Sequence, residues 1–307
     1  MISTKTLVLG LDGIDNNFWK SIDAFSLVDY CDELETYMST LPSWMCSLTG
    51  REFTERRSHS FVSHRVYGYK MLWDYLKDIK QIYLNIPVTK PAEKVNGVMV
   101  CGDWRNDKMD STTIYPPELI DGLEALGYVL TDSFQEKLEA RDWDGFLEEA
   151  LRLFSLRTKA IKHLADIIQP EFIFAVYRVS DECLHQRGET RLGKKRIQKM
   201  EKALALELQE VIDTLQPETT LFFSDHSITP EGYHGADHPE TVWGTWGLKT
   251  ELDHIPPIDR AHILDIFPTI LTSLDIDVPK LKGSSLVASS SDRKSFETKL
   301  RRLGYIA

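Results

Sequence analysis

The sequence predicts a single α/β domain, residues 1–307, in which helices cover both faces of a mostly parallel central sheet. Apolar runs at 6–11, 172–177 and 221–223 are typical of buried strands, because a strand covered on both faces has no polar side. Strand and helix patterns alternate without repeats or low-complexity linkers, as this class requires. The 307 residues, 42% of them hydrophobic, suffice for one large core.

The other elements follow from hydrophobic spacing and turn residues. Runs bounded by turn signals predict further strands at 81–86 and 242–247, and the segment 91–103, which contains the turn signal Asn-Gly at 96–97, is expected to be an excursion interrupted by Pro and Gly. Helical spacing predicts helices at 40–50, 70–77, 191–215 and 262–274. The stretch between 12 and 39 is expected to hold a loop and a short helix. A largely helical cap insertion, at about 104–168, is expected to lie over the sheet edge.

Composition excludes several classes of function. A net charge of −11 argues against nucleic acid as the main partner, because phosphate contacts need clustered Lys and Arg. The four cysteines are scattered and form no C-x-x-C pair, so neither a zinc knuckle nor a dithiol redox motif is indicated. No run has the pattern of a signal peptide or a membrane span, so we expect a cytoplasmic protein without a membrane partner.

Potential metal ligands follow each of the three buried strands. Asp12 comes after the first strand, Asp181 and then His185 come after the second, and Asp225 and His226 come after the third. Parallel strands end at one edge of the sheet, where ligands of such folds bind. Carboxylate and imidazole groups are suitable ligands for a divalent metal ion. The sequence therefore predicts a metal site at this edge.

Each of these residues also has an ordinary interpretation. An Asp after a strand often forms a turn, Thr40 could be a plain helix cap, and Asp181 with His185 could be a surface pair on a helix. Caps and surface pairs have no reason to gather at the ends of three apolar strands, so the metal-site interpretation is favoured for the set. No role in the metal site is expected for the histidines outside these patterns, which are His59, His64, His163, His254 and His262.

Five short motifs follow one another along the chain. They are Leu-Asp-Gly at 11–13, Thr-Leu-Pro with Leu-Thr-Gly at 40–42 and 48–50, Asp-x-x-x-His at 181–185, Ser-Asp-His at 224–226, and His-Gly at 234–235. Matches outside them lie at 73–77, 85–89, 95–100 and 263–269. In these residues the chain resembles the alkaline phosphatase superfamily, and most of all its type I phosphodiesterase/nucleotide pyrophosphatase branch. The resemblance covers most of the chain and is weakest at about 103–168.

The resemblance implies an alkaline phosphatase-like fold with two divalent ions roughly 4 Å apart. Zinc is favoured, because several imidazoles accompany the carboxylates, and manganese is the alternative. The implied ligands of one ion are Asp12, Thr40, Asp225 and His226. Those of the second are Asp181, His185 and His234, with His238 in reserve. Thr40 would also be the catalytic nucleophile, forming a phosphothreonyl intermediate that water hydrolyses.

The implied function is a metal-dependent hydrolase of a small phosphoester, closest to phosphodiesterases and nucleotide pyrophosphatases. A phosphomonoesterase, a phosphonate hydrolase or a phosphoglycerate-mutase-like enzyme would use a similar site, so these alternatives stay open. An alternative of another class is a catalytically silent protein that binds metal or a phosphorylated ligand. A sulfatase is disfavoured, because its modified Cys or Ser nucleophile would stand where this chain has Thr40.

Two positions depart from the pattern of the branch. Ser43 stands where the nucleotide pyrophosphatases carry an Asn that holds a phosphate oxygen, and Ser227 stands where Ser-Asp-His is usually followed by Gly. The first departure argues against nucleotide-type diester specificity, and the second indicates an altered local backbone. Ser43 and Arg178 are the candidate substrate contacts, the latter because a guanidinium fork suits a non-bridging phosphoryl oxygen.

Overall fold

The computed structural model describes residues 4–15, 18, 30–37, 39–53, 68–102, 108–131, 134–188, 190–234, 240–246 and 260–287. The strands in these ranges are β1 (Thr6–Leu11), β2 (Tyr30–Glu35), β3 (Gln81–Pro87), β4 (Gly97–Gly102), β5 (Ile114–Tyr115), β6 (Phe172–Tyr177), β7 (Thr219–Phe223), β8 (Glu240–Trp246) and β9 (Ala261–His262). The helices are α2 (Thr40–Thr49), α3 (Leu72–Tyr75), η3 (Pro117–Leu119), α4 (Ile120–Ala125), α5 (Gln135–Ala140), α6 (Trp143–Ile168), α7 (Val179–His185), α8 (Gly193–Leu215), η5 (Ile263–Asp265) and α9 (Ile266–Ser273).

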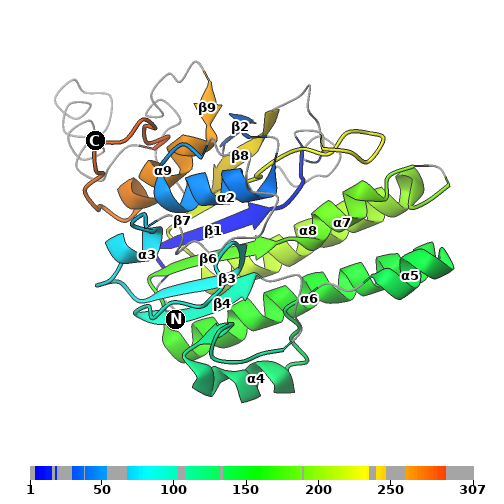
Figure 1. Cartoon of the computed structure of the whole chain (residues 1–307), viewed down its shortest axis with the longest axis horizontal. Coiled ribbons are helices and arrows are strands. Elements are labelled where there is room, and N and C mark those ends of the chain that lie inside the picture. The colour runs from blue at the N-terminus through cyan, green and yellow to red at the C-terminus, as the bar shows by residue number, and fades with distance from the viewer. Residues whose placement is uncertain are drawn as a thin grey trace, which may run out of the picture.

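The described strands form one sheet in the order β5-β4-β3-β6-β1-β7-β8-β2-β9. The five strands from β4 to β7 in this order are parallel neighbours. Antiparallel pairs join β5 to β4, β8 to β7 and β2 to β8. The predicted fold class, a mostly parallel sheet with helices around it, is confirmed (Figure 1).

The expectation of a loop and a short helix between residues 12 and 39 is wrong for residues 30–35, which form the strand β2. Its sequence, YCDELE, contains three acidic residues, which are poor strand formers, and Leu34 is its one fully buried side chain. The strand pairs with β8 on one side and β9 on the other. Tertiary pairing, and not local preference, therefore determines its conformation.

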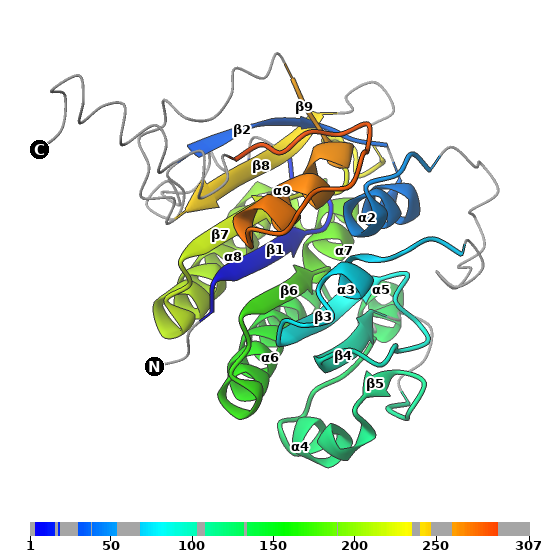
Figure 2. The same ribbon diagram turned by 90° about the vertical axis from the view of Figure 1, so that its left-hand side faces the viewer.

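Successive side chains of a strand point to opposite faces of the sheet, so the core has two layers. Leu7, Leu9 and Leu11 of β1 belong to a cluster with the buried faces of α6 and α8, whereas Val8 belongs to the cluster under α2, α3 and α9. Figures 1 and 2 show these two groups of helices on opposite faces of the sheet. A fully buried apolar side chain of this size contributes on the order of 2 kcal/mol. Burial on both faces explains why apolar residues predominate in the central strands β1, β6 and β7.

The helix α2 is fixed to the sheet through Trp44. Its ring is fully buried and lies 6.2 Å from the ring of Phe174 and 5.3 Å from that of Phe223, measured between centroids. A Cβ added to Gly10 of β1 would collide with the same indole ring. The absence of a side chain at Gly10 thus allows α2 to approach β1 closely.

We expect Gly10→Ala to lower the free energy of unfolding by about 1–3 kcal/mol, because the new methyl group overpacks the space that Trp44 fills. Chemical denaturation followed by tryptophan fluorescence measures the change. A variant as stable as the wild type would mean that α2 can move away from the sheet at no cost.

The carboxyl ends of the parallel strands define one edge of the molecule. The helix α7 directly follows β6 at this edge, and α5 with the first turns of α6 and α8 projects past it (Figure 1). Within the expected cap insertion, α6 packs along α8 over the sheet face, and Lys162 of α6 pairs with Glu210 of α8 at 2.7 Å. No helix in the described part of the chain is both long and apolar enough to cross a membrane.

Candidate metal centre

Three neighbouring loops carry most of the predicted ligands. Asp12 directly follows β1, Asp181 and His185 lie on α7 after β6, and Asp225 and His226 follow β7. Because β1 lies between β6 and β7 and is parallel to both, these three loops leave the sheet side by side. The topology therefore brings residues that are far apart in sequence to one place.

The first group of potential ligands is fully enclosed. Asp12, Asp225 and His226 are at most 1% exposed, and each offers a ligand atom within 4.8 Å of the others. His226 Nε2 lies 3.2 Å from Asp12 Oδ1 and 3.5 Å from Asp225 Oδ2. Two carboxylates and an imidazole in such proximity form a site for a divalent cation.

A second group lies beside the first and reaches towards solvent. It consists of Asp181, His226 and His234, whose ligand atoms also lie within 4.8 Å of one another. The rings of His226 and His234 stack at 4.3 Å between centroids, and the His185 ring lies 5.0 Å from that of His234. His185 Nε2 is 3.4 Å from Asp181 Oδ1. His226 is within reach of both groups, whereas the resemblance implied that it serves only the ion held by Asp12 and Asp225.

Thr40 is the first residue of α2, and Ser39 is the residue that caps the helix. Thr40 Oγ1 lies 3.0 Å from His226 Nε2, so the hydroxyl borders the enclosed group. The first amides of a helix have no partner within it, and they favour a nearby anion. The first turn of α2 contains no acidic residue that would compete for this position.

The electrostatics of the two groups fit a bound cation. Asp12 Oδ1, Asp181 Oδ1 and Asp225 Oδ2 are buried and have no hydrogen-bond partner among the described residues. Burial, together with the charge of Asp12, raises the pKa of Asp181 to about 7, and the same causes raise the pKa of Asp225 well above its usual value. Carboxylates held together in this way bind a proton or a metal ion, because their charges are otherwise costly to bury.

The same carboxylates also affect the pKa of the His226 imidazole. Burial alone would lower its pKa, but the charge of Asp225, the close contact of Nε2 with Asp12 Oδ1 and the charge of Asp181 raise that pKa to about 10. The surrounding carboxylates thus create a strong preference for positive charge at this point. A divalent ion satisfies that preference and leaves the imidazole neutral as a ligand.

The tautomer of His185 is determined by the loop that carries His234. His185 Nδ1 lies 2.7 Å from the carbonyl oxygen of Gly232 and must donate to it, which leaves Nε2 as the ligand atom. Gly232 has a φ of +88°, and a Cβ there would meet the His185 carbonyl oxygen at 2.6 Å. Only glycine permits this approach, and no pattern in the sequence indicates that role.

Two serines connect the loops. Ser224 Oγ accepts a hydrogen bond from the amide of Ile14 and donates to the carbonyl of His226. Ser180 Oγ lies 2.7 Å from the Asp12 carbonyl oxygen, to which it donates. Each serine therefore joins the loop after β1 to a neighbouring ligand loop. Ser224 belongs to a recognised motif, but its bridging role depends on loop contacts that the sequence does not reveal.

A third link between the loops is made by Arg187, just after α7. Its Nη1 lies 3.4 Å from Asp15 Oδ2 and 3.2 Å from the carbonyl oxygen of Ile228. Asp15 lies in the loop of Asp12, and Ile228 lies in the loop of Asp225 and His226. One guanidinium thus contacts two ligand loops from the end of the third.

We expect Arg187→Met to weaken metal affinity by roughly 10- to 100-fold, which is typical when a group that orients ligands is removed. Competition with a chromogenic chelator measures the affinity. Arg152→Met is the matched control, because Arg152 pairs with Glu149 on the exposed side of α6. Equal affinities in the two variants would show that Arg187 does not position the ligand loops.

The remaining predicted site residues do not belong to the two ligand groups, and one of them lies outside the described residues. Ser43 is fully buried, and its hydroxyl donates to the Tyr37 carbonyl, so it is left out of the proposed substrate contacts. Arg178 is 5% exposed and pairs with Glu182 at 3.4 Å. His238, the reserve ligand, lies outside the described residues.

The sequence has no detectable relative among curated proteins, and no family model matches it. Solved structures do match its fold. A 2-O GAG sulfatase superposes with a TM-score of 0.53 at 10% identity over 92% of this chain and 73% of the sulfatase. Phosphonoacetate hydrolase from Sinorhizobium meliloti 1021, in complex with phosphonoformate, gives 0.50 at 11% identity over 76% of this chain and 58% of that enzyme.

The chain has the alkaline phosphatase-like fold. A protein bound to its substrate D-glucosamine-2-N,6-O-disulfate matches equally well, with a TM-score of 0.53 at 9% identity over 94% of this chain and 80% of that protein. The matched structures thus include a sulfatase and a phosphonoacetate hydrolase. The resemblance read from the motifs is confirmed at the level of the fold, while the ester that this chain acts on is a separate question.

Proposed function

We propose that this chain is a metal-dependent phosphoesterase that uses Thr40 as its nucleophile. The observation that carries the proposal is the position of Thr40 Oγ1, 3.0 Å from His226 Nε2 at the start of a helix and beside the enclosed carboxylates. A hydroxyl in such a place can attack a phosphorus atom whose oxygens face the helix amides. The fold comparisons are compatible with this chemistry but do not select it.

The proposed ions are two, one held by Asp12, Asp225 and His226 with Thr40, and the other by Asp181 and His234 with His185, whose Nε2 lies 3.4 Å from Asp181 Oδ1. Zinc suits this mixture of imidazoles and carboxylates best, and manganese is next. When bound, such ions would lower the pKa of the Thr40 hydroxyl and neutralise charge on the phosphoryl group. His185 offers Nε2 because its Nδ1–H donates to Gly232.

The reaction then has two displacements. In the first, the Thr40 oxygen forms a bond to phosphorus, the bond to the leaving oxygen breaks, and the hydroxyl proton ends on the departing alcohol. In the second, water attacks the phosphothreonine, the bond between Thr40 Oγ1 and phosphorus breaks, and the hydroxyl is restored. The amides at the start of α2 face the phosphoryl oxygens in both steps.

The charges around the groups favour a diester. Arg178 pairs with Glu182 and Arg187 with Asp15, so both guanidiniums next to the ligands already have a carboxylate partner. A phosphodiester brings one negative charge to a site that already contains Asp12, Asp181 and Asp225, whereas a monoester brings close to two. We therefore propose a modest preference for a small diester over the matching monoester.

We expect kcat/KM to be highest for bis-p-nitrophenyl phosphate, lower for p-nitrophenyl phosphate and lowest for p-nitrophenyl sulfate, all measured with zinc and with manganese. The sulfate ester tests whether this chain has sulfatase activity, because one of the matched structures is a sulfatase. A tenfold preference for the monoester, equivalent to about 1.4 kcal/mol in transition-state stabilisation, would reverse the proposed specificity. No turnover of any of the three would favour a silent metal-binding protein.

A further inference from the structure

A cleft of about 660 Å³ lies on the side of the molecule opposite the candidate metal centre. Its lining includes Gln81 and Gly97, the first residues of β3 and β4, whereas the metal ligands follow the last residues of β6, β1 and β7. All five strands are parallel, so the cleft opens at their amino ends. A strand of six residues spans roughly 20 Å, which sets the scale of the separation.

The floor of the cleft requires a residue without a side chain. Gly97 has a φ of +143°, and a Cβ at this position would collide with the carbonyl oxygen of Gln81. The amide of Gln81 in turn donates to the Asn96 carbonyl. The turn Asn96-Gly97 therefore brings the starts of β3 and β4 together and leaves space above them. The volume lies within the range of about 300–1,000 Å³ that is typical of small-molecule sites.

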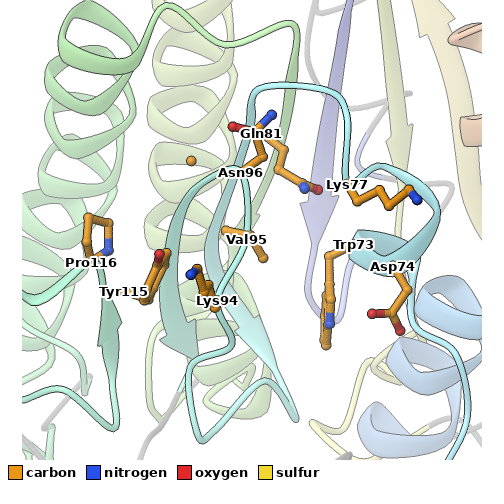
Figure 3. Close-up of a pocket in the computed structure, with 10 residues that line it drawn as sticks. Trp73, Asp74, Lys77, Gln81, Lys94, Val95, Asn96, Tyr115 and Pro116 are labelled. Carbon is orange, nitrogen blue, oxygen red and sulfur yellow. The ribbon is translucent and has the colours of Figure 1, made fainter.

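Aromatic side chains form two walls of the cleft. Figure 3 shows Trp73 and Tyr115 on either side of Lys94 and Val95. Trp73 is held rigidly, because it is 6% exposed and meets the ring of Tyr83 edge-on at 5.6 Å between centroids. Tyr115 is half-buried and belongs to the short strand β5. The space between the walls thus has apolar sides that need no rearrangement to contact a ring.

The charge in the cleft is positive. Lys77 and Lys94 both line it, both are exposed, and neither forms an ion pair or hydrogen bond with a described residue. The carboxylate that also lines it, Asp74, accepts a hydrogen bond from the Met71 amide through Oδ2. Two unpaired lysines beside aromatic walls are notable in a chain with a net charge of −11.

We propose that this cleft binds a small aromatic anion, with its ring between Trp73 and Tyr115 and its anionic group at Lys94. Aromatic side chains provide contact area at little conformational cost, and an ammonium group beside them selects a negatively charged ligand. The site is separate from the candidate metal centre and needs no metal ion. Its occupancy is therefore independent of the reaction proposed above.

The test uses naphthalene-2-sulfonate, an aromatic anion without a phosphoryl group, titrated calorimetrically into the full chain in the presence of zinc. We expect binding to the wild type and a rise in Kd of at least about tenfold in Lys94→Glu, because the charge that meets the sulfonate is reversed. Methanesulfonate, which lacks the ring, should bind at least about tenfold more weakly than the aromatic probe.

Two control variants separate the cleft from other causes. Lys280→Glu, at an exposed lysine outside the cleft, should bind the probe like the wild type. Asp225→Asn, which alters the metal centre, should also bind it unchanged. No binding to the wild type, an unchanged Kd in Lys94→Glu, or loss of binding in Asp225→Asn would each overturn the proposal.

Discussion

Thr40→Ala is expected to lower kcat/KM by at least about a thousandfold, or roughly 4 kcal/mol of transition-state stabilisation, while the fold and the metal content stay close to those of the wild type. The hydroxyl is indispensable as a nucleophile but is only one of several groups around the ions. Its loss removes the interaction with His226 Nε2 and leaves Asp12 and Asp225 in place. Steady-state kinetics and metal analysis on the same preparation measure both quantities.

Two neighbouring variants provide the controls for this result. Thr40→Ser retains a hydroxyl and should recover a substantial part of the activity. Ser39→Ala changes the capping residue, whose side chain makes no capping hydrogen bond, so it should have nearly normal activity. If Thr40→Ala itself turns over diesters at a near-normal rate, water attacks directly and Thr40 is only the start of a helix.

The second large expected effect is that Asp225→Asn destabilises the chain only when metal is present. With metal present, this variant should be less stable than the wild type, because saturating metal at 100 to 1,000 times its Kd contributes about 3–4 kcal/mol to a chain that binds it. In a chelator, the variant should be as stable as the wild type or more so. Burial and the charge of Asp12 raise the pKa of Asp225, so a neutral amide removes a cost of the metal-free state.

Thermal unfolding of both proteins, in zinc and in a chelator, measures this dependence on metal. For a chain of 307 residues each kcal/mol shifts Tm by roughly 1.5 °C, so a change of about 3–4 kcal/mol is resolved. Asp166→Asn, at an exposed position on α6, is the matched control and should respond to metal like the wild type. A variant that is destabilised equally in zinc and in chelator would indicate that Asp225 has a purely structural role.

The most predictable elements of the fold are strands in which every side chain is buried, because burial favours a continuous run of apolar residues. β1, β6 and β7 are buried along their whole length. β1 and β6 have the predicted limits, whereas β7 begins two residues before the predicted apolar run, because its first residues, Thr219 and Thr220, are polar. The helix α2 ends at Gly50, which has a φ of +64°, as its place in the sequence indicated. Because parallel strands end at one edge, the residues that follow them could be placed together without any knowledge of contacts.

The parts that could not be predicted depend on contacts between distant segments. β2 is held by β8 and β9, and its acidic sequence gives little sign of a strand. All residues of α2 after Thr40 are buried, so helical spacing could not reveal which of them face the site. The links made by Arg187 and Gly232 exist only because three loops meet at the sheet edge.

The central claim is that the ends of β1, β6 and β7 hold divalent metal ions. Elemental analysis of the purified chain by inductively coupled plasma mass spectrometry, side by side with Asp225→Asn, tests it most directly. The proposed site predicts about two divalent ions per chain in the wild type, with zinc the most abundant, and a clear loss in the variant. A wild-type chain that contains no such ion, and takes up neither zinc nor manganese on dialysis, would contradict it.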